Sequence, residues 1–150
     1  MEDMENFKNE LDYYCDIKNH DITCFMDLGT PIDKKYIEAN TKRNGKDRTD
    51  CYCNLMDDLE AQYALKLLEL GLTLYREPRL KDCSSRPDFY VYNEELQEGV
   101  LVEITQYKKN NNSEKKGKQH QNIREFSHIY GIPFIPLFRE DLEMMGLHTL

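Results

Sequence analysis

The sequence predicts an α/β fold of the α+β type, in which helices flank a central β-sheet. An amphipathic helical pattern runs from 59 to 70, two strand-like runs flank a polar connection at 93–99, and a second helical pattern precedes an apolar run with two prolines. The 150 residues, of which 39% are hydrophobic, suffice for one compact domain. We expect a single domain over 1–150, with its core at about 55–140 and an N-terminal elaboration at 1–54.

The N-terminal third carries the weakest structural signals. A helical pattern is faint at 5–14, and the apolar run 22–26 predicts a short strand. The stretch 41–49 contains Asn-Gly, which is typical of a tight turn, so it predicts either a hairpin tip or a solvent-exposed loop.

The helix at 59–70 has clear boundaries. Asp57 and Asp58 stand near its start, and Gly71 follows its end. Directly after it, 72–77 alternates in polarity until Pro78 stops the strand.

Two acidic residues frame the next two strands. Asp88 precedes the run 89–92, and Glu103 lies inside the apolar run 100–104. The polar stretch between the runs ends in glycine and predicts a hairpin, so the strands should be antiparallel. The start of the first strand then lies beside the end of the second, which brings the carboxylates of Asp88 and Glu103 towards each other. Alternation places Glu103 on the face opposite its aliphatic neighbours, together with two other residues of its strand, Leu101 and Thr105.

The C-terminal part predicts a helix, a strand and a short helix. The first helix runs over 119–130 and ends at Gly131, the prolines at 132–138 favour an edge strand, and 139–145 is a short terminal helix. The last residues carry an apolar surface that either docks a second subunit or covers the core: Met144, Met145, Leu147 and Leu150.

An acid within an apolar strand needs neutralisation, the more so in a chain with a formal net charge of -8. A divalent cation would neutralise both Asp88 and Glu103, and hard oxygen ligands suit Mg²⁺ or Mn²⁺. The structural alternative is that Asp88 caps a turn after Pro87 and that Glu103 forms an ion pair with a lysine.

The order of these elements resembles the core of the PD-(D/E)XK nuclease superfamily, the restriction-endonuclease-like fold. The resemblance covers about half the chain, from 59 to 137, and rests on four matches: Leu59-Glu60 on the helix, Gly71 to Glu77 after it, Pro87-Asp88-Phe89, and Val102-Glu103. It implies a mixed sheet and a metal-binding pair, Asp88 and Glu103, which Glu60 completes.

One position departs from the family pattern. The family places a lysine two residues after the acidic residue, to orient the attacking water and stabilise the transition state, and this chain has Thr105 there. Two nearby residues are candidates for that role, Gln106 and Lys118.

The expected activity is Mg²⁺- or Mn²⁺-dependent hydrolysis of phosphodiester bonds by an endonuclease that cuts DNA at a specific site or structure. Among members of the fold, small enzymes of the homing, phage or resolvase type match this size. One alternative is an RNA endonuclease similar to the cap-snatching enzymes of segmented negative-strand viruses, with His20 as an additional metal ligand. Another is a nucleic-acid-binding module without catalysis, which Thr105 suggests.

Basic side chains gather in two segments although the chain is acidic. The segment 34–48 contains six basic and two acidic residues, and the segment 107–124 contains six basic residues and one acidic residue. Both segments suit phosphate contacts, and solvated loops are the alternative. The residues proposed for nucleic-acid contact are Lys42, Arg43, Lys46, Arg48, Lys108, Lys109, Lys115 and Lys116.

An odd number of cysteines, five, and the lack of a signal-peptide pattern indicate a soluble, intracellular protein with reduced thiols. The resemblance to small phage-type and viral nucleases also allows that a phage or virus encodes it. Ordinary buried thiols are favoured over structural zinc, because Cys51 and Cys53 are separated by one residue only. No apolar run approaches the roughly 18 residues of a membrane span, and a homodimer is a further expectation.

Overall fold

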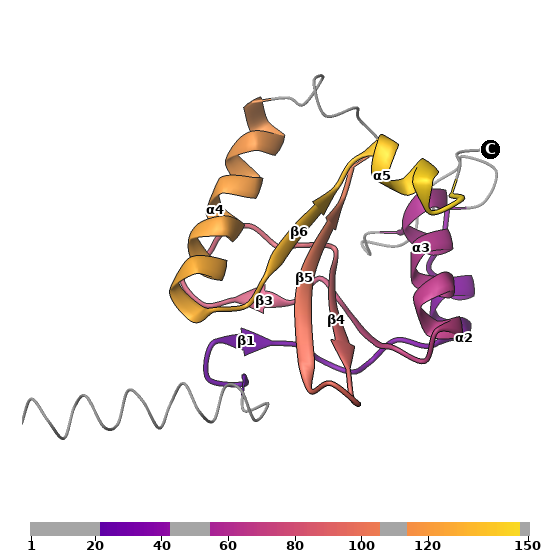
Figure 1. The fold of residues 1–150 in the computed structure, drawn as a ribbon, viewed down its shortest axis with the longest axis horizontal. Helices are drawn as coiled ribbons and strands as arrows, with labels where there is room; N and C mark the ends of the chain where they lie inside the picture. The colour runs from indigo at the N-terminus through magenta and orange to yellow at the C-terminus, as the bar shows by residue number, and fades with distance from the viewer. Residues whose placement is uncertain (1–21, 43–54, 106–113, 148–150) are drawn as a thin grey trace, which may run out of the picture.

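The computed structural model describes residues 22–42, 55–105 and 114–147, with the backbone alone described for 114–116 (Figure 1). The elements follow in this order: β1 (Met26–Asp27), α2 (Lys34–Ala39), α3 (Asp58–Glu69), β2 (Thr73–Arg76), β3 (Arg79–Leu80), β4 (Phe89–Asn93), β5 (Glu98–Ile104), α4 (Glu114–Tyr130), β6 (Phe134–Leu137) and α5 (Arg139–Met144).

The main sheet has four strands in the order β2-β4-β5-β6. The pairs β2/β4 and β4/β5 are antiparallel, whereas β6 lies parallel to β5 at the edge. The predicted mixed sheet with flanking helices is therefore confirmed, and so is the edge position of the last strand. Strands β1 and β3 pair separately as a small antiparallel sheet.

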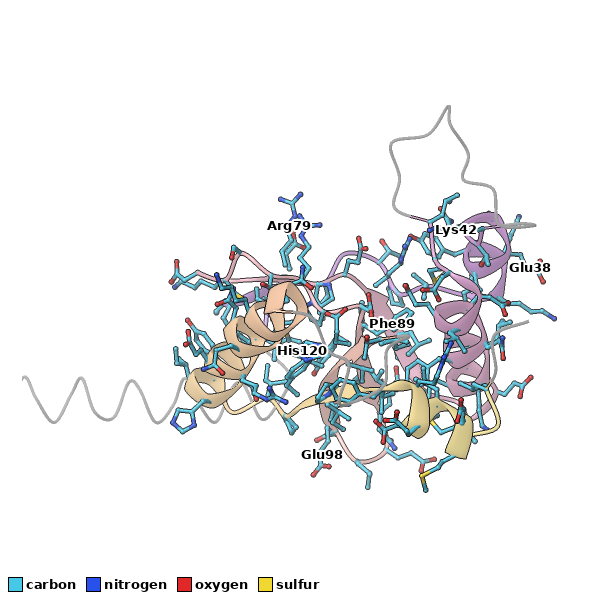
Figure 2. All side chains as sticks on the ribbon, turned by 90° about the horizontal axis from the view of Figure 1, so that it is seen from above. Glu38, Lys42, Arg79, Phe89, Glu98 and His120 are labelled. Atoms are coloured by element: carbon cyan, nitrogen blue, oxygen red, sulfur yellow. The ribbon has the colours of Figure 1, made fainter. Side chains whose placement is uncertain are left out.

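Helices cover both faces of the sheet, α4 on one side and α3 with α2 on the other (Figure 1). One core cluster joins α3, α2 and α5 to the face that carries Leu74, Phe89 and Val102. A second cluster joins Ile123 and Phe126 of α4 to the opposite face. In the view from above, Phe89 lies between the two helical layers (Figure 2). This three-layer arrangement buries both faces of the central strands.

Local chemistry explains why α3 begins and ends where it does. Asp57 is the N-cap, and its side chain accepts a 2.9 Å hydrogen bond from the backbone N–H of Glu60. After Leu70, Gly71 has a φ of 81°, a conformation that glycine adopts at little cost. The cap places Glu60 in the first helical turn, where the partial positive charge of the helix N-terminus favours a carboxylate.

The β4–β5 hairpin forms as the sequence predicts. The Asn93 side chain accepts hydrogen bonds from the backbone N–H groups of Glu95 and Leu96, at 3.0 and 3.2 Å, which stabilises the turn. Gly99 lies under the ring of Tyr90, and a Cβ there would come within 2.0 Å of the Tyr90 hydroxyl. The strand therefore needs glycine at this position.

Several expectations were wrong in detail. Residues 23–25 form a turn, and the strand is β1 at Met26–Asp27, because that pair is the part that meets β3. No element was predicted for 34–39, the part of the first basic segment that forms helix α2. Helix α4 begins at Glu114, five residues earlier than predicted, so the end of the second basic segment is helical and not a loop.

The C-terminal apolar residues mostly cover the core. Leu147 is buried and Met145 packs against the same cluster as α3, whereas Met144 is 88% exposed. Leu150 lies outside the described residues. Among the helices that the structure describes, none combines the length and hydropathy that crossing a membrane requires.

A candidate carboxylate site at one end of the sheet

Asp88 and Glu103 lie side by side at the end of the sheet where β4 begins and β5 ends. Phe89 pairs with Val102 in the antiparallel register, so the residue before one and the residue after the other are neighbours. Glu103 is 4% exposed, on the face of β5 that it shares with Leu101, as alternation predicts.

Hydrogen bonds hold Asp88 in this position. Its Oδ2 atom accepts a 2.6 Å hydrogen bond from the backbone N–H of Ile104, and its side chain also hydrogen-bonds Glu103. Its backbone carbonyl accepts a 2.8 Å hydrogen bond from the N–H of Glu77, the residue after β2. The carboxyl group of Asp88 is therefore held by β5, and its backbone by the residue that follows β2.

Glu60 of α3 belongs to the same electrostatic cluster. Burial raises the pKa of Asp88 well above its usual value, and the charges of Glu60 and Glu103 raise it further. Burial likewise raises the pKa of Glu60 to about 8, followed by the charge and hydrogen bond of Asp57 and by the charge of Glu103, while Arg76 lowers it. The charges of Glu60 and Glu103 thus act on Asp88, and the charge of Glu103 acts on Glu60, in a largely buried environment.

The donor set fits a hard divalent cation. A side-chain hydrogen bond joins Asp88 and Glu103, and a metal ion bound between them would offset the repulsion of two ionised carboxylates. Carboxylate ligands must be deprotonated to bind a metal ion. A cation that binds a carboxyl group with a raised pKa therefore displaces its proton. In the described part of the chain no three His, Cys, Asp or Glu side chains are placed to hold a metal together, so Glu60 does not form a ready three-ligand site with this pair.

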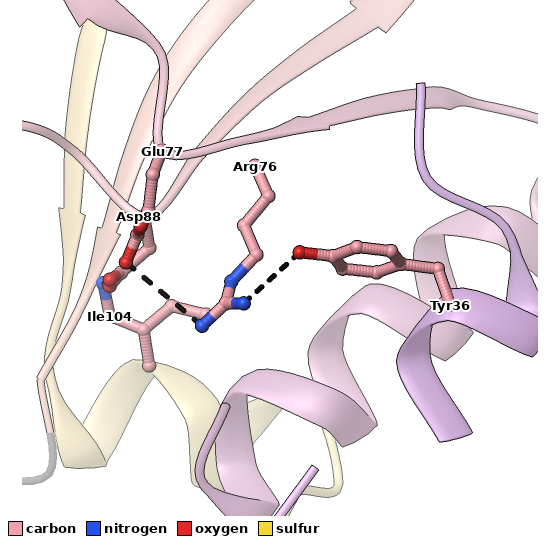
Figure 3. Close-up of polar contacts among 5 residues, drawn as sticks. All are labelled: Tyr36, Arg76, Glu77, Asp88 and Ile104. Atoms are coloured by element: carbon pink, nitrogen blue, oxygen red, sulfur yellow. Dashed lines mark hydrogen bonds and ion pairs between the residues drawn. The ribbon is translucent and has the colours of Figure 1, made fainter. Parts of the chain in front are cut away.

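Arg76 is a basic side chain at this site that the sequence did not single out (Figure 3). Its Nη1 lies 3.2 Å from the Tyr36 hydroxyl of α2, and its Nη2 lies 4.0 Å from Oε1 of Glu77. The Arg76 side chain is 8% exposed. The alternation of β2 was the available signal, since it places Arg76 on the face of Leu74 and hence of α3.

Glu77 was matched to the family pattern without a role, and the structure adds an observation about it. Its φ of 49° lies in the left-handed region, which a non-glycine residue rarely adopts. This conformation directs the N–H of Glu77 to the carbonyl of Asp88. Sequence patterns carry no signal for such a conformation at a glutamate.

Two residues, Lys118 and Gln106, are candidates for the role of the lysine that the family pattern has at position 105. Lys118 is exposed on α4, and Gln106 lies outside the described residues. Thr105 itself is 2% exposed, and its N–H donates to the carbonyl of Leu137 in β6 at 2.9 Å. The position of the family lysine is therefore occupied by a buried, neutral side chain.

Most residues proposed for nucleic-acid contact fall outside the described part. Lys42 is exposed three residues after the end of α2, and its backbone N–H donates to the Met56 carbonyl at 2.9 Å. Figure 2 shows its side chain at the margin of the molecule on the α2 side. Lys115 and Lys116 lie in α4, with backbone alone described. The others are not described: Arg43, Lys46, Arg48, Lys108 and Lys109.

Most residues of the zinc hypothesis, and the alternative metal ligand His20, lie outside the described part of the chain. The cysteines concerned are Cys15, Cys51 and Cys53. Cys24 is exposed and Cys83 is partly buried, so the expectation of buried thiols is wrong for Cys24.

A cavity of about 490 Å³ lies away from the carboxylates. Its lining includes Tyr75, Tyr90 and Tyr92, and none of the three site carboxylates. Burial raises the pKa of Tyr90 to about 12, so this hydroxyl stays protonated at neutral pH. A phosphoryl transfer that uses Tyr90 as nucleophile is accordingly disfavoured, because such a nucleophile needs a lowered pKa or an adjacent base.

Comparison with known proteins finds no match to this chain, whether among family models, curated proteins or solved structures.

Proposed function

We propose that this chain is a Mg²⁺- or Mn²⁺-dependent nuclease with a restriction-endonuclease-like core, which hydrolyses phosphodiester bonds in nucleic acid. One observation carries the proposal: Glu60 of α3, Asp88 before β4 and Glu103 of β5 lie at one end of the sheet, where burial and the neighbouring carboxylates raise the pKa of Glu60 and of Asp88. Such a cluster is unfavourable for stability alone, and a cation in contact with it removes the repulsion.

Each carboxylate has a role in this proposal. Asp88 and Glu103 hold the cation directly, and Glu60 completes the site from α3. The bound metal supplies a Lewis acid for the phosphoryl oxygen and lowers the pKa of a bound water. In the overall reaction water adds across one P–O bond: its oxygen bonds to phosphorus, and its protons pass to the leaving sugar oxygen and to solvent.

DNA is the favoured substrate and RNA the alternative. Both are polyanions that the basic segments at 34–48 and 107–124 suit. The chemistry of the carboxylates does not depend on the sugar. A site- or structure-specific endonuclease of the homing, phage or resolvase type is the form that we favour.

The test is a cleavage assay that does not require the recognition site to be known. Purified protein is incubated with a pool of random-sequence duplex DNA and with mixed single-stranded RNA, in Mn²⁺, Mg²⁺ or EDTA, and new ends are identified by sequencing. We expect metal-dependent new ends in one of the pools, and none with Asp88→Asn. Binding of nucleic acid without new ends from either pool would support the non-catalytic module and overturn the enzyme.

A further inference from the structure

The site lacks the lysine of the family pattern but has a basic side chain beside its carboxylates. Thr105, at the family's lysine position, is buried and neutral. Among the basic groups that the structure describes, Arg76 is the one whose charge acts on Glu60. It reaches the site from β2, the strand next to β4, whereas the family lysine would stand on β5.

The neighbouring backbone ties Arg76 to the carboxylates by a short series of contacts. Arg76 pairs with Phe89 in the register of β2 and β4, and the next residue, Glu77, donates its N–H to Asp88. Asp88 in turn accepts the N–H of Ile104. Movement of the Arg76 backbone relative to Asp88 would therefore require β2 and β4 to separate.

Two side chains orient the guanidinium. The Tyr36 hydroxyl lies 3.2 Å from Nη1 on one side, and Glu77 lies 4.0 Å from Nη2 on the other (Figure 3). The Glu77 contact is at the long limit of an ion pair, and the Glu77 side chain is 30% exposed. It is a partner that a more highly charged group, such as a phosphate, can replace.

We propose that Arg76 is the catalytic cation of this site, which contacts the scissile phosphate in place of the family lysine, and that Tyr36 is its positioning residue. The inference rests on the proposed nuclease function. A guanidinium suits the role because it stays charged at any physiological pH and presents a planar fork to phosphate oxygens. Its positive charge stabilises the extra negative charge that develops on the phosphate oxygens as water attacks phosphorus.

The test compares single-turnover cleavage rates at saturating enzyme, with the nucleic-acid pool that the wild type cuts in Mn²⁺. Arg76→Met removes the charge and keeps an unbranched apolar stem, Arg76→Lys restores a charge, and Tyr36→Phe removes one hydroxyl. Arg79→Met is the matched control, because Arg79 is an exposed arginine on β3. Mn²⁺ binding, followed by electron paramagnetic resonance, and the melting temperature are measured for each variant.

We expect Arg76→Met to lower the cleavage rate about 100-fold or more, Arg76→Lys to restore part of it, and Tyr36→Phe to lower it less than Arg76→Met does. Mn²⁺ affinity stays equal or increases in Arg76→Met, because a positive charge beside the carboxylates is gone. A merely structural arginine would instead weaken Mn²⁺ binding and lower the melting temperature in parallel with the rate. That parallel loss would overturn the proposal.

Lys118→Ala separates the two candidate cations. If Arg76 supplies the charge, Lys118→Ala changes the saturating rate by less than threefold, in keeping with the exposure of Lys118 on α4. A 100-fold loss in Lys118→Ala with a normal rate in Arg76→Met would assign the role to Lys118 and leave the nuclease function standing. A wild type that neither binds Mn²⁺ nor cuts would overturn both proposals together.

Discussion

The Oδ2 atom of Asp88 accepts a 2.6 Å hydrogen bond from the backbone N–H of Ile104. This contact joins the residue before β4 to the last residue of β5, and it directs the Asp88 carboxyl group towards Glu103. The bond by itself lowers the pKa of Asp88, but burial and two neighbouring carboxylates outweigh it. The chain thus places an acid where holding a negative charge is unfavourable, which is typical of functional sites.

Asp88→Asn should remove activity without unfolding the protein. The amide oxygen can still accept the Ile104 N–H, so we expect a melting temperature at pH 8 equal to or above that of the wild type, because a buried charge is gone. Cleavage should fall at least about 1,000-fold, since a metal ligand is lost. Circular dichroism and the cleavage assay check both statements, and unfolding of the variant would show that Asp88 is structural.

Stability of the metal-free protein should fall as pH rises. Between the ordinary pKa of 4.5 and the folded-state value of about 8, Glu60 keeps a proton in the folded protein that the unfolded chain has lost. The free energy of unfolding therefore decreases across this window, by roughly 2–4 kcal/mol, and Asp88 acts in the same direction.

Urea unfolding in EDTA at several pH values measures this decrease. Glu60→Gln should flatten the profile, whereas Glu69→Gln, an exposed change on the same helix, should leave it as it is. Saturating Mn²⁺ should restore the stability lost at pH 8, by about 2.7 kcal/mol at 100 times the dissociation constant. A profile that rises between pH 5 and 8 would contradict the electrostatic description of the site.

Asp57→Asn should move this window to lower pH. Asparagine caps a helix about as well as aspartate, so α3 keeps its first turn, while Glu60 loses the charge that, after burial, raises its pKa most. We expect higher stability at pH 8 and tighter Mn²⁺ binding at pH 7. The matched control is Asp33→Asn at the equivalent cap of α2, which should change neither quantity. An unchanged pH profile in Asp57→Asn would show that Asp57 does not act on Glu60.

Gly99→Ala tests the packing of the sheet independently of the site. The added Cβ would approach the Tyr90 hydroxyl to 2.0 Å and its Cζ atom to 2.2 Å, so the whole ring must move. We expect a loss of about 1–3 kcal/mol in the free energy of unfolding. Adding Tyr90→Phe should recover little, because the ring carbon also clashes. Wild-type stability of Gly99→Ala would contradict the register of β4 and β5.

Much of the fold and the three carboxylates could be predicted because their signals are local. The helix periodicity after Asp57, the hairpin between β4 and β5, and the alternation around Glu103 each lie within one segment. The antiparallel hairpin then makes the meeting of Asp88 and Glu103 a consequence of register. Glu60 was placed by resemblance, since nothing local shows that α3 packs with its first turn at this end of the sheet.

The remaining features depend on contacts between distant segments. Arg76 reads as an ordinary strand residue until Tyr36, forty positions away, is seen beside it. Strand β3 has two residues and forms because β1 pairs with it. A run of two residues is too short to show a periodic pattern in the sequence. The early start of α4 was hidden because lysine and glutamate there read as a solvated loop.

The most direct test of the central claim is a Mn²⁺ titration followed by electron paramagnetic resonance, on the wild type and Asp88→Asn at pH 8. We expect saturable binding to the wild type and at least a tenfold weaker affinity in the variant, because Asp88 and Glu103 hold the ion together. Equal affinity in both proteins, or no binding to either, would contradict a metal site built from these carboxylates.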